Sequence, residues 1–272
     1  MPSGKSSKRK RREVAAAPPP ARGPSRGVSR TASPRVLLIG GAVVLVVAIA
    51  IVVAVVVFGG SSTNSLKDEP LIGSIAEGLP QAGYVQQLFK GIPQNGNILG
   101  KASAPVTMVE FIDLQCPYCR DFETEVVPDL LSKYVRTGVL KIELQPWAFI
   151  GPDSIRGQAA VLAAAKQNHG FDYAELLYAN QQTENTGWLD DTMVAAVARS
   201  IPGLRVHVLL NERNSAVIKS AQATVAALAK ADGVNSTPTL FVGKSGGQGT
   251  LVHMSGPTDE QAVVAAIKAA KG

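Results

Sequence analysis

A run of 23 residues without a charge, Val36 to Phe58, divides this chain of 272 residues. The run consists mostly of Val, Ile, Leu and Ala and has no polar face. An α-helix rises about 1.5 Å per residue, so the run would span roughly 35 Å, enough for a hydrocarbon core of about 30 Å. It predicts a single N-terminal transmembrane helix, and the globular fold must lie elsewhere in the chain.

A cleaved signal peptide is the alternative interpretation of this run. The apolar region of a signal peptide is usually about 7–15 residues long and follows a short basic start. Here 35 residues precede a longer run, and the stretch from Phe58 to Ser62 has no clear small-residue cleavage site. An uncleaved signal-anchor is therefore favoured.

The basic charge of the chain is concentrated before this run. Residues 1–35 hold ten Lys or Arg and one acid, Glu13, for a net charge of +9, whereas the rest of the chain has a net charge of −3. The cluster Lys8–Arg12 could indicate nucleic-acid binding, but next to a membrane helix the positive-inside rule explains it better. We therefore expect no nucleic-acid partner, a disordered cytoplasmic tail at 1–35 and a single-pass membrane topology. Everything after Phe58 then lies outside the cytoplasm, where disulfides persist.

The remainder divides into a linker and one domain. Residues 59–95 are rich in Gly, Ser, Pro and Asn, which predicts an extracytoplasmic linker. One short segment of it, Tyr84–Lys90, is compatible with a helical turn, and we expect part of the linker to pack on the domain. Residues 96–272 are enough for one domain with its own core.

The pattern of this domain indicates the α/β class. Val106–Leu114 is almost continuously apolar and β-branched, which predicts a strand covered on both faces. Apolar residues at helical spacing follow, in a helix that Pro128 should kink. Trp147 and Phe149 are interpreted as core residues rather than peptide contacts. The remaining predicted elements are a strand at Leu140–Leu144, an Ala-rich helical insertion at about 152–232, strands at Thr239–Val242 and Thr250–Met254, and a helix at Pro257–Lys271.

The chain has only two cysteines, Cys116 and Cys119, in the stretch DLQCPYCRDFE. A structural disulfide between them would close a very small loop and remove little entropy from the unfolded chain. A zinc site needs four ligands. The chain adds only three scattered histidines, which form no paired ligand motif: His169, His207 and His253. We therefore predict no metal site.

Redox chemistry fits the cysteine pair better. Cys116 comes where the predicted strand gives way to a helix, and Pro117 suits the first helical position because its missing N–H costs nothing there. The unpaired N–H groups and the macrodipole of a helix N-terminus favour a thiolate. Cys119 lies one turn further on, within reach of a mixed disulfide on Cys116. The pair therefore predicts dithiol–disulfide exchange.

Two stretches of the sequence resemble a known family. APVTMVEFIDLQCPYCRDF and GVNSTPTLFVG are similar to the signature regions of the DsbA-like branch of the thioredoxin superfamily, in particular its membrane-anchored bacterial members. The resemblance covers about Gly96 to Gly272. It implies a thioredoxin-like fold with an inserted α-helical domain, and a redox disulfide that needs no metal or organic cofactor. It also implies that Cys116 is the nucleophile and Cys119 the resolving cysteine.

The resemblance implies further site residues. Glu110, six residues before Cys116, matches a buried acid that would move protons for the Cys119 thiol; a carboxylate on a solvent face is the alternative. Burial would raise its pKa. Thr237–Pro238 matches the cis-proline loop of the family, although an ordinary trans proline opening a strand is also compatible with the sequence. This loop and the dipeptide Pro117–Tyr118 would bind substrate.

One departure from the family concerns the residue between the cysteines. Tyr118 stands where strongly oxidising members commonly have a histidine, and a neutral phenol adds no positive charge near the thiolate. Arg120 supplies a positive charge, but Asp121 and Glu123 oppose it. The oxidising strength of the pair therefore stays open.

Taken together, the sequence predicts a membrane-anchored, extracytoplasmic thiol–disulfide oxidoreductase. It would act as a monomer, form disulfides in exported thiol-containing proteins and be reset by a membrane redox partner, a quinone-linked oxidase. One alternative is a disulfide reductase or isomerase with the same site. Isomerases of this superfamily usually carry a dimerisation module before the catalytic domain, and the predicted linker is too short for one. The other alternative is a non-enzymatic, anchored peptide-binding module.

Overall fold

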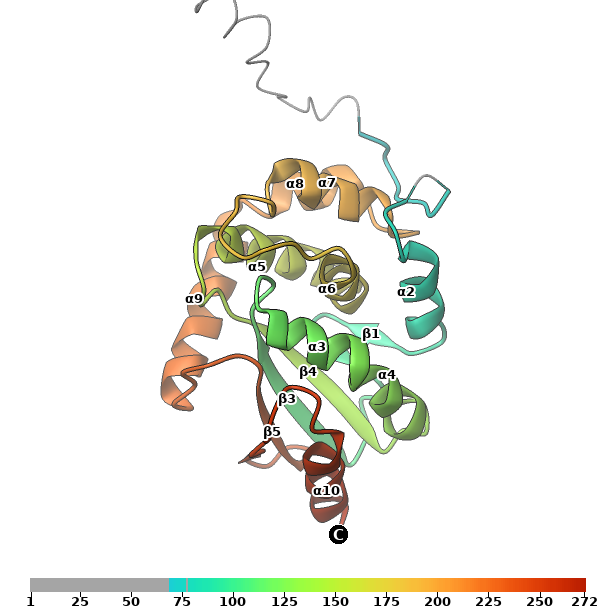
Figure 1. Cartoon of the computed structure of the whole chain (residues 1–272). Helices are drawn as coiled ribbons and strands as arrows, with labels where there is room; N and C mark the ends of the chain where they lie inside the picture. Colours follow the sequence, from blue (N-terminus) through green and yellow to red (C-terminus); the bar gives the residue numbers. More distant parts are fainter. Residues whose placement is uncertain (1–68, 77) are drawn as a thin grey trace, which may run out of the picture. The chain divides into compact units, whose positions relative to one another are not determined.

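The computed structural model describes residues 69–76 and 78–272. The predicted tail at 1–35 and the predicted transmembrane helix at 36–58 lie outside the described residues. Within the described ranges, no helix is both long enough and apolar enough to cross a membrane. These residues form a six-stranded sheet with helices around it (Figure 1).

The strands of the sheet follow the order β1-β2-β4-β3-β5-β6 in space. Their bounds are β1 Gln94–Asn95, β2 Ile98–Leu99, β3 Val106–Ile112, β4 Leu140–Pro146, β5 Thr239–Lys244 and β6 Thr250–Leu251. The central strand β3 runs parallel to β4 and antiparallel to β5. The strand predicted to reach Met254 ends earlier, at Leu251, and the strand predicted to reach Leu114 ends at Ile112.

The central strand β3 is buried on both faces, as its continuous apolar run predicts. Met108 and Ile112 point into the main core, whereas Phe111 packs with Ala229 and Val234 on the opposite face of the sheet. Side chains alternate along a strand, so Glu110 shares the main-core face with Met108 and Ile112. This parity places a carboxyl group inside the largest apolar cluster of the described chain.

Three helices and one π-helical turn cover the main-core face of the sheet (Figure 1). They are α3 Pro117–Glu125, α4 Val127–Leu130, the π turn Leu131–Val135 and α10 Glu260–Lys271. Val126 separates α3 from α4, and Pro128 follows at the start of α4. Proline has no N–H to bond to the preceding turn, which explains the break that the sequence predicts here.

Five helices lie between β4 and β5, where the sequence predicts a helical insertion. They are α5 Pro152–Ala165, α6 Gly170–Ala179, α7 Asp191–Arg199, α8 Val206–Glu212 and α9 Ala216–Ala231. Asp190 and Ser215 cap α7 and α9 by accepting N–H bonds from the first turn. The sequence did not predict α8. Its β-branched start does not favour a helix, which here depends on burying Val206, Leu209 and Leu210.

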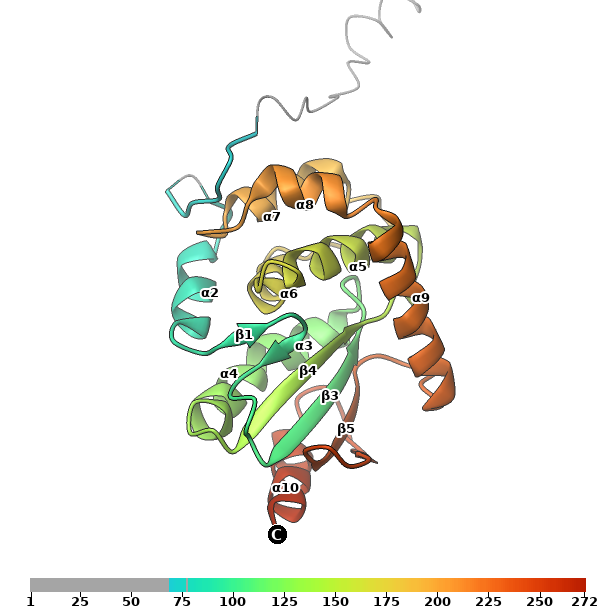
Figure 2. The ribbon, with the colours of Figure 1, turned by 180° about the vertical axis from the view of Figure 1, so that it is seen from behind.

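The ordered fold begins before residue 96, where the sequence analysis placed its boundary. Helix α2, Ala82–Phe89, buries Ala82, Val85 and Phe89 and packs on α6. β1 then pairs with β2, which pairs with β4, so this hairpin extends the sheet (Figure 2). The predicted domain boundary at residue 96 is therefore too late, whereas the helical turn predicted at Tyr84–Lys90 and the packing expected for part of the linker are present. Such short elements carry a weak sequence pattern and are stabilised by the surfaces that they cover.

Candidate active site

Cys116 stands at the N-terminus of α3, with Pro117 at the first helical position. Its backbone is extended, with φ −70° and ψ 120°, and its N–H donates to the carbonyl of Asp113 at 3.0 Å. Asp113–Cys116, the cysteine loop, thus turns the chain from β3 into α3. Cys116 is 5% exposed, whereas the neighbouring Tyr118 is 60% exposed.

The environment of Cys116 favours a thiolate. The pKa of Cys116 is lowered to about 6, chiefly by a hydrogen bond from the Cys119 thiol, while burial opposes this effect. The side chain of Thr237 and the backbone N–H groups of Cys119 and Tyr118 contribute to this lowering. The backbone donors lie at the N-terminus of α3, where the macrodipole also favours an anion. Cys116 is therefore mostly a thiolate at neutral pH.

Cys119 has the opposite preference, although it lies only one turn along α3. Its side chain is fully buried, and burial raises the pKa of this thiol well above the usual value. The hydrogen bond to Cys116 and the charge of the Cys116 thiolate raise it further. Cys119 is therefore a protonated thiol that donates to its neighbour.

The loop before β5 lies against Cys116. The peptide bond between Thr237 and Pro238 is cis, and the Cys116 Sγ lies 3.4 Å from the carbonyl oxygen of Thr237. Pro117 and Pro238 are each partly exposed. The structure thus brings together the cysteine pair and the Thr237–Pro238 loop, which lie far apart in the sequence.

Asp113 holds this arrangement together, and the sequence analysis did not identify it. One carboxylate oxygen accepts the N–H of Gln115 at 2.8 Å and the hydroxyl of Ser154 at 2.7 Å. The other accepts the N–H groups of Phe149 and Ile150 at 2.7 and 2.8 Å. A single buried side chain therefore joins the cysteine loop, the segment after β4 and the start of α5.

The helical insertion also holds the cysteine loop. The Tyr178 hydroxyl donates to the Asp113 carbonyl at 2.9 Å, and the Gln181 amide donates to the carbonyls of Leu114 and Cys116, at 3.1 Å each. Gln115 donates to Ser154 and accepts the N–H of Asn185 at 2.7 Å.

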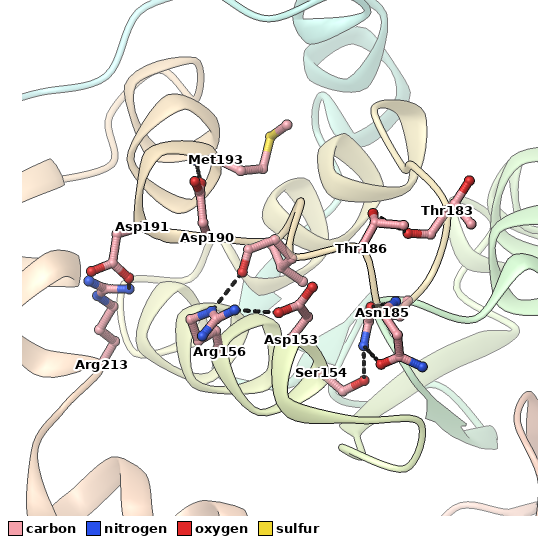
Figure 3. A network of polar contacts seen from close by, with 12 residues as sticks. Asp153, Ser154, Arg156, Thr183, Asn185, Thr186, Asp190, Asp191, Met193 and Arg213 are labelled. Carbon is pink, nitrogen blue, oxygen red and sulfur yellow. Dashed lines mark hydrogen bonds and ion pairs between the residues drawn. The ribbon is translucent and has the colours of Figure 1, made fainter. Parts of the chain in front are cut away.

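Figure 3 shows Ser154 and Asn185 within a larger polar network. There the Arg156 guanidinium binds Asp153 and the Leu189 carbonyl, while Arg213 pairs with Asp191. The charged side chains of the insertion around α5 are therefore paired with one another.

Three carboxyl groups are buried behind the cysteines. Glu110 lies on β3, Glu123 on α3 and Glu175 on α6, and the most exposed of the three, Glu123, is 6% exposed. We call these residues the acid cluster. The predicted burial of Glu110 is present, with its pKa raised by burial and by the charges of Glu123 and Glu175. A role for Glu110 in proton transfer stays a prediction.

The sequence analysis did not place Glu123 and Glu175 in the site. Glu123 was interpreted as a charge opposing Arg120, but burial raises the pKa of Glu123 to about 8, so it is mostly neutral at pH 7. Arg120 instead pairs with Asp121 at 2.8 Å on the surface. The sequence did contain a signal for Glu123: it follows Cys119 by four residues, and this spacing places both side chains on the same face of a helix.

The interpretation of Trp147 and Phe149 as core residues is wrong for Phe149. Its side chain is 50% exposed, and its ring centroid lies 4.7 Å from that of Trp147. Trp147 is partly buried against Phe111 and its neighbours. The N–H groups of Phe149 and Ile150 donate to the Asp113 carboxylate and hold this segment, so an aromatic surface lies next to the cysteine loop.

Comparisons with known proteins agree with this geometry. A family model described as thioredoxin matches residues 94–266. The chain is 31% identical over 147 residues to the probable disulfide bond formation protein D of Bacillus cereus, covering 53% of this chain and 68% of that protein. It belongs to the DsbA-like thiol–disulfide oxidoreductases of the thioredoxin superfamily.

A more distant relative by sequence and a solved structure agree with this assignment. Disulfide bond formation protein D of Bacillus subtilis is 26% identical over 159 residues, covering 58% of this chain and 70% of that protein. The crystal structure of oxidised BdbD from Bacillus subtilis matches with a TM-score of 0.58 at 20% identity, covering 75% of this chain and 99% of that one. The predicted thioredoxin-like α/β fold is thereby confirmed.

This membership also bears on the alternatives to redox chemistry. Within residues 69–76 and 78–272, no group of three or more His, Cys, Asp or Glu side chains is arranged to hold a metal ion. The two cysteines instead form a pair with opposite preferred protonation states. In this family such a pair exchanges disulfides, which rules out the non-enzymatic peptide-binding module.

Proposed function

We propose that this enzyme forms disulfides in exported proteins, with its catalytic domain outside the cytoplasm and an anchor at residues 36–58. The observation that carries the proposal is the contrast between the two thiols. A stabilised Cys116 thiolate makes the reduced pair a good product, and an oxidant is strong when its reduced form is stabilised. The charge-free run and the basic tail support the location.

The reaction follows from these preferences. A substrate thiolate attacks Cys116 Sγ of the Cys116–Cys119 disulfide, and Cys119 leaves and takes up a proton in its buried site. A second substrate thiolate then attacks the substrate sulfur of the mixed disulfide, and Cys116 leaves as a thiolate. Two electrons pass from the substrate to the cysteine pair.

Binding of the substrate and resetting of the pair complete the cycle. The exposed Tyr118 ring, Pro117 and the Thr237–Pro238 loop surround the thiol that a peptide must reach. We propose that they bind the substrate chain, with the aromatic surface of Phe149 beside them. A quinone-linked oxidase in the membrane would accept the two electrons from the reduced pair. The enzyme acts as a monomer in this scheme.

The cysteine roles are tested by trapping. Cys119→Ser should accumulate mixed disulfides between Cys116 and exported proteins, whereas Cys116→Ser should trap none. The complexes are recovered from cells after acid quenching and alkylation, and the trapped chains are identified by mass spectrometry. Trapping by Cys116→Ser alone would reverse the assignment of nucleophile and resolving thiol.

The direction and location are tested separately. We expect the wild-type pair to be mostly oxidised in cells and a reporter fused after Gly60 to be active only outside the cytoplasm. We also expect a reduction potential between about −270 mV, as for thioredoxin, and about −120 mV, as for DsbA. Mostly free thiols in cells would favour the reductase alternative, and a cytoplasmic reporter signal would contradict the proposed location.

A further inference from the structure

We propose that Gln115 is a positioning residue that couples the reactivity of Cys116 to the loop between α6 and α7. This loop, residues 180–190, belongs to the helical insertion, and we call it the α6–α7 loop. The inference rests on the proposed role of Cys116 as the nucleophile and adds a residue that acts on this thiol from outside the cysteine pair. In this scheme the insertion sets the geometry of the reactive thiol.

The Gln115 side chain is fully buried, although it directly precedes the reactive cysteine. Its amide is paired with Asn185 of the α6–α7 loop: Gln115 Oε1 accepts the backbone N–H of Asn185 at 2.7 Å, and Gln115 Nε2 lies 3.5 Å from Asn185 Oδ1. Gln115 Nε2 also donates to the Ser154 hydroxyl at 2.9 Å. A buried amide with these partners keeps one orientation, because turning it would leave polar atoms unpaired.

Ser154 extends this contact to Asp113. The Ser154 hydroxyl donates to Asp113 Oδ1 at 2.7 Å, and the same oxygen accepts the Gln115 backbone N–H at 2.8 Å. Ser154 and Asn185, which both contact Gln115 Nε2, lie next to each other in Figure 3. The side chain and the backbone of Gln115 are therefore fixed by one closed ring of hydrogen bonds.

The α6–α7 loop binds three successive residues of the cysteine loop. The Gln181 amide donates to the carbonyls of Leu114 and Cys116 at 3.1 Å each. Asn185 binds the side chain of Gln115, which lies between them in the sequence. A displacement of the α6–α7 loop would therefore move the backbone on both sides of the residue that precedes the thiol.

The Asn185 end of this contact is also fixed. Asn185 has a φ of 58°, in the left-handed region that asparagine adopts more readily than most residues. Its side chain lies against Gly151, where an added Cβ would come within 2.2 Å of Asn185 Oδ1. Residues 182–187 are exposed to solvent. The α6–α7 loop thus connects the surface of the insertion to the buried residue before Cys116.

This connection matters because the Cys116 thiolate depends on donors at fixed positions. The Cys119 thiol is the main donor that lowers the pKa of Cys116, and the backbone N–H groups of Cys119 and Tyr118 contribute. Hydrogen bonds weaken steeply when they are misaligned. Gln115 fixes the peptide group that precedes Cys116, so loss of its bonds should loosen the position of Cys116 Sγ and weaken the thiolate.

The substitution Gln115→Met tests this connection without changing any charge. Methionine is unbranched and has about the length of glutamine, but its thioether is only a weak acceptor. A shift in the pKa of Cys116 would then reflect geometry, because the ionisable groups around it are unchanged. These groups are Tyr118, Cys119 and the Arg120–Asp121 pair on α3, Asp113 in the cysteine loop, Tyr178 on α6 and Glu184 in the α6–α7 loop.

The experiment titrates Cys116 in the reduced full-length chain and follows the thiolate absorbance at about 240 nm. We expect a wild-type midpoint near the pKa of about 6, and a midpoint about one pH unit higher in Gln115→Met. The reduction potential of Gln115→Met should also become more negative, because its reduced form is less stabilised.

Gln158→Met is the matched control, because Gln158 is also a buried glutamine but does not contact the cysteine loop. Its amide donates to the Pro146 carbonyl at 2.8 Å and accepts from Gln222 at 3.1 Å. Both variants should lose stability against urea, since each leaves buried polar groups unpaired. Only Gln115→Met should shift the titration of Cys116.

A further variant, Gln181→Met, approaches the same contact from the α6–α7 loop. Gln181 is partly exposed, so this variant decides if Gln115→Met does not fold, and its midpoint should also rise. The double variant should shift by less than the sum of the two, because both residues hold one loop. Midpoints equal to that of Gln158→Met would overturn the inference. A wild-type midpoint near the ordinary thiol value would instead contradict the proposed role of Cys116.

Discussion

The cysteine loop and the acid cluster are neighbours, yet they favour opposite charge states. At the loop, backbone N–H groups and the Cys119 thiol converge on Cys116 and favour a thiolate. One helical turn deeper, the surroundings are apolar, and Cys119, Glu110, Glu123 and Glu175 keep their protons. Cys116 is itself almost buried, but its donors outweigh the effect of burial, whereas burial is the largest cause that raises the pKa of the other four groups.

This contrast explains why one short helix can carry both halves of a redox reaction. The outer thiol must be a good nucleophile and a good leaving group, which a low pKa provides. The inner thiol must not compete for the substrate while it is reduced, and a raised pKa with full burial prevents this. The contrast therefore gives each cysteine a single role.

The largest expected effect is in the reactivity of the two thiols. In single-cysteine variants at pH 7, Cys116 in Cys119→Ser should react with iodoacetamide at least about 100-fold faster than Cys119 in Cys116→Ser. The rate for Cys116 should rise with a midpoint near its pKa of about 6. Similar rates for the two thiols would contradict the contrast.

Replacing Cys119 by alanine instead of serine tests the main cause of the low pKa of Cys116. The hydrogen bond from Cys119 is the largest contribution that lowers the pKa of Cys116. Cys119→Ser keeps a hydroxyl donor at this position, whereas Cys119→Ala removes the donor, so the alanine variant should have the higher Cys116 pKa. Thiolate absorbance at about 240 nm measures both values. Equal pKa values in the two variants would remove Cys119 from the explanation.

The cysteine loop could be predicted from the sequence, whereas most of the acid cluster could not. The chemistry of the loop is local: Cys116, Pro117 and Cys119 are adjacent on one helix, and the preceding strand is a clear apolar run. The Thr237–Pro238 loop was found only through its resemblance to a family motif. Its approach to Cys116 depends on the pairing of β3 with β5.

Glu175 and Asp113 depend on tertiary packing in a way that no local pattern reveals. An acid in a helix is usually solvated, and the face of α6 that meets α3 is set by the packing of the insertion. The Asp113 carboxylate accepts bonds from three segments, and the farthest of its donors, Ser154, lies 41 positions further along the chain. Glu123 is intermediate, since its spacing from Cys119 was visible but its burial was not.

The next largest expected effect concerns how the stability of the folded enzyme depends on pH. Because the folded-state pKa of Glu123 is raised to about 8, its contribution to stability is fully present below the unfolded value of 4.5 and is lost as pH rises through about 8. Glu110 and Glu175 act with the same sign. The melting temperature of the oxidised enzyme should therefore fall from pH 5 to pH 9.

The exposed Glu125, on the same helix two residues from Glu123, provides the control for the cause of this fall. Glu123→Gln should flatten the fall in melting temperature, because glutamine does not ionise, whereas Glu125→Gln should leave it unchanged. Using the oxidised enzyme removes the titration of the two thiols from the comparison. A steep fall that persists in Glu123→Gln, with the same slope as in the control, would show that Glu123 is solvated rather than buried.

The smallest expected effect concerns Tyr178, which links the two regions. Its hydroxyl donates to the Asp113 carbonyl of the cysteine loop, and it lies close enough to Glu123 and Cys119 for their charges to raise its pKa. Tyr178→Phe should lower the free energy of unfolding by about 1 kcal/mol, the usual value of one hydrogen bond, as measured by urea denaturation.

Tyr173→Phe is the control for this prediction, because Tyr173 lies on the same helix, is equally buried and donates to the Val194 carbonyl, away from the cysteines. Both variants should lose similar stability. Only Tyr178→Phe should also change the rate at which Cys119 releases a cysteine peptide held on Cys116 as a mixed disulfide. The change should be less than about threefold, since the Asp113 carbonyl keeps its bond from the Cys116 N–H. Equal release rates in the two variants would mean that α6 supports the cysteine loop through packing alone. A fall in this rate much larger than threefold would mean that Tyr178 takes part in the exchange reaction itself rather than linking the two regions.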